Sequence, residues 1–277
     1  MDTGVLYVAT GDEYVAEAKR SAETLRDAMP DVSVTLVTDG DLESPLFDRV
    51  IRMSDPAYSY VDKITGMELS PYDRTVFLDT DVYVADAVDE LFEMLDGVDI
   101  AAAVAPNRDL NTTNPGVPAS FPEYNTGVLP YTDAASDLLD EWKRLYQADH
   151  KHDQPAFREA AYESDLRIAT LPREYNCLYG APGHLVNDVK ILHGNIAYTE
   201  YPSDRRFPRL AKLWYWGGAE RVLDDLNSCS SHRHYHRHGS TACRDVTTWN
   251  RFVLSVRRHG LGATARRMAA ILAEKVS

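Results

Sequence analysis

The chain has 277 residues, of which 44% are hydrophobic, so it is long enough to bury the core of one elaborated α/β domain. Its 43 acidic and 29 basic residues give a formal net charge of -14. A surface this negative excludes general binding to nucleic acid, because phosphate contacts need clustered cations.

The composition also indicates a compartment. Three cysteines in a chain of this length do not make a disulfide framework, which favours a reducing environment. No run of roughly 18 apolar residues occurs, and no basic stretch followed by an apolar one opens the chain, so we expect a cytoplasmic protein. The excess of Asp over Glu and the 7 Lys against 22 Arg resemble haloarchaeal cytoplasmic proteins, with an ordinary acidic enzyme as the alternative.

Apolar strands alternate with segments of helical periodicity along most of the chain. We expect strands at residues 4–10, 32–38, 50–53, 74–78, 100–104, 124–129 and 189–192, and helices at 14–29, 87–95, 133–147 and 154–162. This alternation predicts an α/β fold with a mostly parallel central sheet flanked by helices, and ligands then bind beyond the carboxyl ends of the strands. An irregular stretch at 106–122 is long enough to cover such a site.

Two segments near the C-terminus differ from this pattern. Residues 229–245, which include Cys229 and Cys243, are rich in His, and we expect a polar loop there. The spacing of these Cys and His residues matches no standard zinc framework, so zinc binding stays open. Residues 246–277 carry six cations against Glu274 alone and show apolar residues at helical spacing. They predict a basic amphipathic helical tail that lies either on the inner membrane face or against the domain's own core.

The strand at 74–78 runs directly into Asp79-Thr80-Asp81. Chance gives roughly three Asp-x-Asp triplets in so acidic a chain, and Asp39-Gly40-Asp41 is another. That second triplet has the composition of a solvated turn, although Asp39 could reach a base or ribose. Asp79 and Asp81 lie between apolar segments, where a buried carboxylate needs a cation or hydrogen bonds. We therefore expect them to hold Mg²⁺ or Mn²⁺ against a leaving diphosphate.

Five motifs follow one another between residues 5 and 198 in this order: Tyr7-Val8-Ala9-Thr10 with Tyr14, Leu78-Asp79-Thr80-Asp81, Tyr124-Asn125-Thr126-Gly127-Val128, His152-Asp153-Gln154 and His193-Gly194. The set resembles the GT-A glycosyltransferases, particularly the family 8-like nucleotide-diphospho-sugar transferases. The resemblance implies a Rossmann-like GT-A domain over residues 1–228. It also implies retaining transfer of a hexose from a nucleotide-diphosphate sugar, UDP-sugar favoured, to a glycan, lipid-linked or protein-linked acceptor.

The resemblance further implies roles for single residues. Nucleotide contacts fall to Thr10 and Tyr14, and Gly127 lets the backbone approach the donor closely. Together with Asp39, the expected set is donor-binding Thr10, Tyr14, Asp39, Lys63, Asp79, Thr80, Asp81, Asn125 and Gly127, metal-binding Asp79, Asp81 and His193, and catalytic Asn125, Asp153 and Gln154.

Simpler interpretations remain for four of these residues. Lys63 could be an exposed helix lysine, Asn125 a buried amide satisfied by backbone groups, and His193 an ordinary hydrogen-bonded histidine. Asp153 could cap a helix that begins at Pro155. If the enzyme inverts configuration, Asp153 is the best candidate for the general base.

One departure from the family pattern follows His193. Ile196 stands three residues after His193, where the family has Gly, and the Lys that the family has six residues after that His is also missing. Neutralisation of the diphosphate would then fall to another cation, with Lys190, Arg205 and Arg206 as the candidates.

Two other functions compete with sugar transfer. A haloacid dehalogenase-like phosphatase would use Asp79 as its nucleophile, but Tyr83 stands where that motif has Thr or Val. A non-catalytic nucleotide-sugar-binding protein is the second alternative, because the binding residues are clearer in the sequence than the chemical ones.

Overall fold

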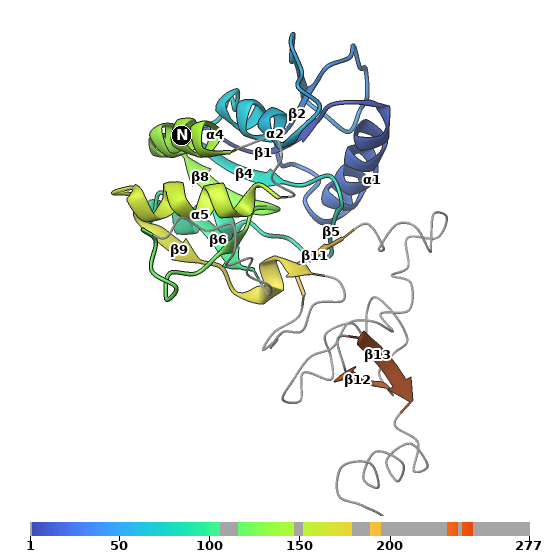
Figure 1. Cartoon of the computed structure of the whole chain (residues 1–277). Helices are drawn as coiled ribbons and strands as arrows, with labels where there is room; N and C mark the ends of the chain where they lie inside the picture. The colour runs from blue at the N-terminus through green and yellow to red at the C-terminus, as the bar shows by residue number, and fades with distance from the viewer. Residues whose placement is uncertain are drawn as a thin grey trace, which may run out of the picture.

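The computed structural model describes residues 2–105, 116–146, 152–178 and 189–194, and the backbone of two strands at 232–237 and 240–245. Within these ranges a twisted sheet carries helices on both faces (Figure 1). The basic tail at 246–277, most of the stretch at 106–122, and both Arg205 and Arg206 lie outside the described residues. Among the helices that are described, none combines the length and the hydropathy needed to cross a membrane.

The central sheet has the strand order β3-β2-β1-β4-β8-β6-β7, with β9 beside β6. The strands are β1 Thr3–Ala9, β2 Val34–Thr38, β3 Arg49–Arg52, β4 Arg74–Leu78, β6 Ile100–Val104, β7 Tyr124–Asn125, β8 Val128–Thr132 and β9 Ile168–Thr170. Strands β3, β2, β1 and β4 pair in parallel, whereas β8 runs antiparallel between β4 and β6. The sheet is therefore mostly parallel, as the sequence predicts.

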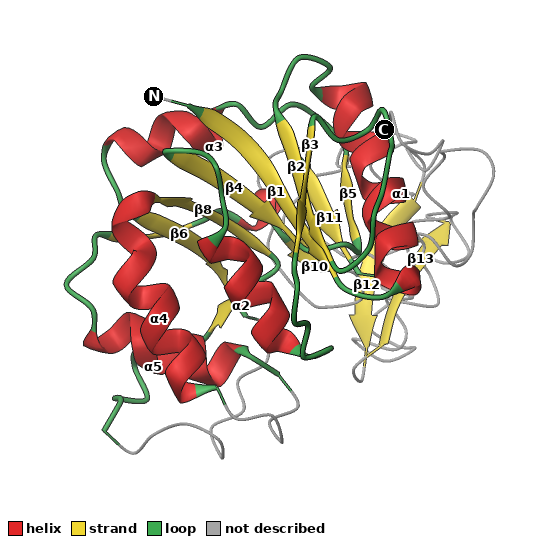
Figure 2. Cartoon of the chain, turned by 90° about the horizontal axis from the view of Figure 1, so that it is seen from above, coloured by secondary structure: helices red, strands yellow, loops and turns green. Residues whose placement is uncertain are grey.

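Helices cover the two faces of the sheet (Figure 2). One face carries α1 (Asp12–Ala28) and α3 (Glu90–Glu93), and the other carries α2 (Tyr60–Glu68), α4 (Ser136–Leu145) and α5 (Gln154–Glu163). Side chains of β1 alternate between the two cores, because successive residues of a strand point to opposite faces: Val5 and Tyr7 pack with α1, and Leu6 packs with α2. Both faces of β1 are thus buried, as expected of a central parallel strand.

A small second sheet lies beside the end of β4. Its order is β10-β11-β5, from Cys177–Leu178, Ile191–His193 and Val82–Val84. In this sheet His193 pairs with Val82 across an antiparallel ladder and with Leu178 across a parallel one. The pairing brings a late segment of the chain directly against the Asp-x-Asp turn.

The structure differs from the expected elements in several places. The strand expected at 124–129 is broken, because Asn125 pairs with β6 whereas Val128 pairs with β4, and a chain that changes partners must turn between them. The helix expected at 87–95 is only α3 followed by a 3-10 turn, η1. The described 3-10 turns are η1 (Met94–Asp96), η2 (Asp133–Ala135) and η3 (Arg173–Tyr175).

The His-rich segment also differs from expectation. Where we expected a loop at 229–245, the backbone forms two antiparallel strands, β12 (His232–Arg237) and β13 (Ser240–Asp245). An antiparallel ladder satisfies backbone hydrogen-bonding groups that a loop would leave to water. Zinc binding by this segment stays a prediction.

Candidate active site

A cleft of about 610 Å³ opens at the carboxyl ends of β1 and β4. This is the edge at which parallel α/β sheets bind ligands. The wall comes from the segments after β1 and β4, the starts of α2 and α5, and the ends of β7, β10 and β11. Its predicted site residues are Thr10, Tyr14, Lys63, Asp79, Thr80, Asp81, Asn125, Asp153, Gln154 and His193.

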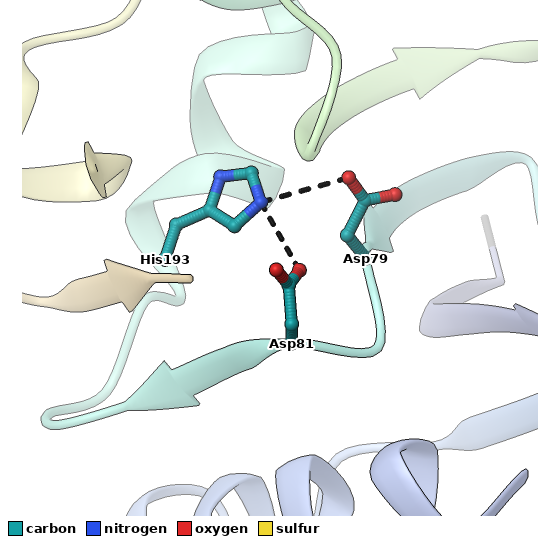
Figure 3. Close-up of side chains that lie close together, drawn as sticks. All are labelled: Asp79, Asp81 and His193. Carbon is teal, nitrogen blue, oxygen red and sulfur yellow. Dashed lines mark ion pairs between the residues drawn. The ribbon is translucent and has the colours of Figure 1, made fainter. Parts of the chain in front are cut away.

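Two carboxylates and an imidazole converge in this cleft (Figure 3). His193 Nε2 lies 3.1 Å from Asp81 Oδ1 and 3.7 Å from Asp79 Oδ2. The backbone holds the group together, because Asp79 N–H donates to the carbonyl of Gly127 and Gly194 N–H donates to that of Asp81. One ligand atom from each of the three side chains lies within 4.8 Å of the others. Oxygen and imidazole ligands in this arrangement fit Mn²⁺ or Mg²⁺.

The electrostatics of the three groups also fit a cation. Burial raises the pKa of Asp79, although the charges of Lys63 and His193 act to lower it. Burial opposes ionisation of Asp81 too, but the hydrogen bond and charge of His193 leave the pKa of Asp81 below its usual value. Burial acts to lower the pKa of His193, yet the hydrogen bond to Asp81 and both carboxylate charges raise it overall. The cluster is therefore a partly buried site that attracts positive charge.

Lys63 connects this cluster to a second acidic residue. Its Nζ lies 2.9 Å from Asp79 Oδ1 and 3.4 Å from Asp153 Oδ2, and it donates to Thr126 Oγ1 at 3.1 Å. Burial lowers the pKa of Lys63, but the charges of Asp153 and Asp79 raise it overall, so the amine stays cationic. The interpretation of Lys63 as an exposed helix lysine is wrong, because only 9% of the residue is exposed.

Asp153 and Gln154 lie at the start of α5. The Asp153 carboxylate accepts a hydrogen bond from Thr126 Oγ1 at 2.9 Å and makes no capping bond to α5, so its side chain does not serve as a helix cap. Trp142 Nε1 donates a hydrogen bond of 3.0 Å to the backbone carbonyl of Asp153. Gln154 lines the cleft, and its buried Oε1 has no hydrogen-bond partner among the described residues. An unpaired buried acceptor at the cleft wall is a group that a ligand hydroxyl would satisfy.

Glu17, which the sequence analysis did not predict, holds the Asp-x-Asp turn. Thr80 Oγ1 donates to Glu17 Oε2 at 2.9 Å, so Thr80 faces α1 as well as the cleft. Burial raises the pKa of Glu17, against the lowering effect of this hydrogen bond. A sequence signal existed, because Glu17 adjoins Ala18 on the buried face of α1.

One end of the cleft is formed by the segments after β1 and before α2, where the sequence predicts the nucleotide, and we call it the nucleotide end. Its polar groups bond to one another. Thr10 Oγ1 donates to Asp62 Oδ2 at 2.7 Å, and Asp62 also accepts from the backbone N–H groups of Ala57 and Tyr58. The Thr10 hydroxyl proton is therefore already committed to the protein. Tyr14 is 56% exposed on the cleft wall, so its ring is free to stack.

Asp39 does not reach the cleft wall. Its carboxylate accepts from Gly11 N–H at 3.0 Å and from the Tyr58 hydroxyl at 3.1 Å. These contacts make Asp39 support two neighbouring segments, and its contact with a base or ribose stays a prediction. Tyr58, missed by the sequence, lines the cleft with a φ of 50°, in a region that non-glycine residues seldom adopt.

Gly127 lies against His193. A Cβ at this position would lie 2.1 Å from His193 Cε1, so the missing side chain makes room for the imidazole. Close approach of the donor to this backbone stays a prediction. Asn125 Oδ1 accepts from Gly127 N–H at 3.0 Å and from Asn176 Nδ2 at 2.7 Å, so a backbone group satisfies only part of this amide.

Lys190 is not the positive side chain that could replace the family's Lys after His193. Its Nζ lies 2.8 Å from Asp86 Oδ2 and donates to the carbonyl of Ala87, and it does not line the cleft. Lys63 is the lysine that the fold places among the site carboxylates.

No protein-family profile and no curated protein matches the sequence. Solved structures match the fold. Galactosyltransferase LgtC, in complex with donor and acceptor sugar analogues, is 15% identical with a TM-score of 0.50, over 69% of this chain and 86% of that one. Mouse xyloside xylosyltransferase 1 in its apo form is 18% identical with a TM-score of 0.50, over 70% of this chain and 98% of that one.

A third structure is glycosyltransferase GlyE from Streptococcus pneumoniae TIGR4, 16% identical with a TM-score of 0.50, over 69% of this chain and 54% of that one. At these identities the likeness establishes the architecture. The mostly parallel sheet flanked by helices is a GT-A glycosyltransferase fold, which confirms the predicted fold class.

Proposed function

We propose that this protein is a divalent-cation-dependent glycosyltransferase that moves a sugar from a nucleotide diphosphate to an acceptor hydroxyl. One observation carries the proposal: the Asp79, Asp81 and His193 cluster lies in a cleft at the carboxyl end of β4, in a GT-A fold. The three structural neighbours are glycosyltransferases by name, and one of them was solved with donor and acceptor sugar analogues.

In this proposal Asp79, Asp81 and His193 hold the cation, which neutralises the charge that grows on the leaving diphosphate. Lys63 lies next to the same group, 2.9 Å from Asp79, and contributes a second positive charge near the phosphates. Tyr14 offers its exposed ring to the base. Thr10 shapes the nucleotide end through its bond to Asp62.

The sugar lies between Asn125 and Gln154. Asn125 Oδ1 is occupied inside the protein, which leaves its amide NH₂ for a sugar hydroxyl. Gln154 Oε1 accepts from a hydroxyl of the donor or the acceptor, since it has no partner among the described groups. Both side chains line the cleft.

The contacts of Asp153 favour retention of configuration. Its carboxylate is 3.4 Å from Lys63 Nζ, accepts from Thr126, and is 3% exposed as a residue, so it is poorly placed to remove a proton as general base. In a retaining transfer the acceptor oxygen bonds to the anomeric carbon as the carbon–phosphate oxygen bond breaks. The acceptor proton then passes to the leaving phosphate oxygen, so the protein supplies no strong base.

The finer parts of the proposal rest on the sequence. They are a family 8-like enzyme of haloarchaeal type, UDP-hexose as donor, a lipid-linked or protein-linked glycan as acceptor, and attachment of residues 246–277 to the inner membrane face. Co-sedimentation with anionic liposomes, with and without residues 246–277, tests the last point. Equal sedimentation of both forms would remove the membrane from the proposal.

The central experiment is a screen of nucleotide-diphosphate sugars with Mn²⁺ or Mg²⁺ that measures release of nucleoside diphosphate. We expect Asp81→Asn to lose activity by roughly 10³-fold or more, because it removes a cation ligand without changing side-chain size. Asp41→Asn is the matched control, since Asp41 belongs to the other Asp-x-Asp triplet and its side chain is 90% exposed.

The outcomes separate the three functions. Turnover without a divalent cation, or full activity in a folded Asp81→Asn variant, would exclude the proposed mechanism. Release of inorganic phosphate from phosphomonoesters would support the phosphatase alternative. Binding of a nucleotide sugar without release of nucleoside diphosphate, over a broad acceptor set, would support the non-catalytic alternative.

A further inference from the structure

Asn176 contacts His193 from the side opposite the carboxylates and belongs to no site predicted from the sequence. It follows the 3-10 turn η3 and precedes β10, which pairs with the strand that carries His193. We propose that Asn176 is a positioning residue that fixes the tautomer of His193, so that the Nε2 lone pair faces Asp79 and Asp81. The proposal deepens the proposed function, since it concerns the cation site of that cleft.

A backbone N–H beside Asn125 fixes the orientation of the Asn125 amide. The N–H of Gly127 is only a donor, and it lies 3.0 Å from Asn125 Oδ1. The Asn125 atom at that position must therefore be the oxygen. This fixes the orientation of an amide whose two ends are otherwise interchangeable in shape.

The same oxygen then fixes the second amide. Asn125 Oδ1 lies 2.7 Å from the nearest atom of the Asn176 amide. Because an oxygen lone pair needs a donor, the Asn176 group that faces it must be the NH₂. The carbonyl oxygen of Asn176 is therefore turned towards His193.

The amide oxygen in turn fixes the imidazole. Asn176 Oδ1 lies 2.9 Å from His193 Nδ1 and is only an acceptor, so Nδ1 carries the hydrogen. In the neutral ring the lone pair then lies on Nε2, which is 3.1 Å from Asp81 Oδ1 and 3.7 Å from Asp79 Oδ2. A lone pair facing carboxylates is repulsive unless a positive group lies between them. The amide chain thus orients Nε2 as a ligand.

Burial strengthens the preference for these amide orientations. Asn125, Asn176 and His193 are 8%, 1% and 6% exposed, so water has little room to replace a lost partner. Reversing either amide, or removing the hydrogen from Nδ1, would leave buried donors or acceptors facing their own kind behind the ring. Gly127 closes the arrangement, because its backbone lies against the imidazole ring and its N–H starts the chain.

The direct test is spectroscopic and needs no metal. The full chain is labelled with ¹⁵N-histidine, and the His193 signals are identified by their loss in His193→Gln. We expect the coupling of a slowly exchanging Nδ1–H in the wild type, because the buried oxygen of Asn176 accepts that hydrogen. The acceptor-retaining variant Asn176→Asp should keep this signature. Asn176→Leu, similar in shape but without hydrogen-bonding groups, should lose it.

The second test measures affinity for Mn²⁺ alone by electron paramagnetic resonance of the free ion. We expect Asn176→Leu to bind Mn²⁺ roughly tenfold or more weakly than the wild type, as is typical when the outer partner of a metal-bound histidine is removed. Cys177→Ala is the matched control: the neighbouring residue is 2% exposed and lies on β10, so its truncation disturbs the same packing without touching His193. This variant should keep wild-type affinity and the wild-type His193 spectrum.

Two results would overturn the inference. One is a metal-free wild type in which His193 shows no protected Nδ1–H, and the other is an Asn176→Leu variant with an unchanged Nδ1–H signal and unchanged Mn²⁺ affinity. A wild type that binds no Mn²⁺ at all would instead overturn the cation part of the proposed function. The metal-free spectrum would still decide the role of Asn176.

Discussion

The two ends of the cleft are built in opposite ways. At the cation end Asp79, Asp81 and His193 point at one another, and a chain of neutral amides supports the imidazole from behind. At the nucleotide end Thr10 and Asp39 point back into the protein, to Asp62, Gly11 and Tyr58.

The two ends therefore depend on a bound ligand to different extents. The cation end gathers two partly buried carboxylates, and the charges of Lys63 and His193 act against their repulsion, so binding of a cation there would be linked to stability. The nucleotide end satisfies its own hydrogen bonds and exposes the rings of Tyr14 and Tyr58, which are 56% and 67% exposed. Substitutions should therefore have large effects on stability or cation binding at the first end and small effects at the second.

The largest expected effect is that of Lys63→Met. Removing this buried cation leaves Asp79 and Asp153 without their positive partner, and breaking such a buried pair typically lowers the free energy of unfolding by about 3 kcal/mol or more. Urea unfolding without metal measures the loss. Added Mn²⁺ should recover part of it, because a ligand that binds only the folded state stabilises that state.

Lys143→Met is the control for Lys63→Met. Lys143 pairs with Glu68, and its side chain is 33% exposed, so its loss should change stability by no more than about 1 kcal/mol. Equal losses for the two variants would contradict the special contribution expected of a lysine buried among the cleft carboxylates.

Gly127→Ala should come next. The new Cβ would lie 2.1 Å from His193 Cε1, so the ring must move away from the carboxylates. We expect a loss of Mn²⁺ affinity of about 10- to 100-fold, with a stability cost of about 1–3 kcal/mol for the crowding. Isothermal titration with Mn²⁺ measures the first effect and urea unfolding the second.

Gly97→Ala provides the matched glycine control. A Cβ there would meet only the carbonyl oxygen of Met94, at an ordinary contact distance of 3.7 Å. We expect wild-type affinity for Mn²⁺. Tight Mn²⁺ binding by Gly127→Ala would show that the ring position is not what Gly127 protects.

The pH dependence of cation binding is the third prediction. The pKa of His193 is raised above its usual value of 6.5, chiefly by Asp81 and Asp79 against the effect of burial. Nε2 must be free of its proton to bind a metal, so Mn²⁺ affinity should rise with pH and level off above that raised pKa. Below it, affinity should fall by about tenfold per pH unit. The His193→Gln variant should lose this part of the slope; an unchanged slope would remove His193 from the ligand set.

The smallest effect should be that of Tyr58→Phe at the nucleotide end. The change removes the hydroxyl of an exposed side chain that donates to Asp39. The free energy of unfolding should therefore change by no more than about 1 kcal/mol, and the donor KM by no more than about fivefold. Steady-state kinetics with the donor found in the screen measures the second quantity. A tenfold or larger rise in KM would mean that the Asp39 contact organises the nucleotide end as strictly as the amides organise the cation end.

Much of the fold was predictable because its signals are local. Strands such as β4, whose expected and observed bounds agree, come from runs of apolar residues, and α1 comes from Ala18, Ala22 and Leu25 at helical spacing. Helix α2 was not predicted as an element, because only Ile64 and Met67 mark its apolar face.

The burial of Lys63 follows from the packing of α2. Gly66 allows the helix to approach β1 so closely that a Cβ would lie 2.5 Å from Val8. A lysine in a short, weakly periodic segment gives no sign of this in the sequence.

By itself, the sequence determined that Asp79 and Asp81 end a buried strand, because a run of apolar residues followed by carboxylates is a pattern of adjacent positions. Only the tertiary structure decided what surrounds them. His193 reaches Asp81 because β11 pairs with β5, and Asn176 reaches His193 because β10 pairs with β11. Such partners are chosen by strand pairing and burial across the chain, and side-chain type alone does not specify them.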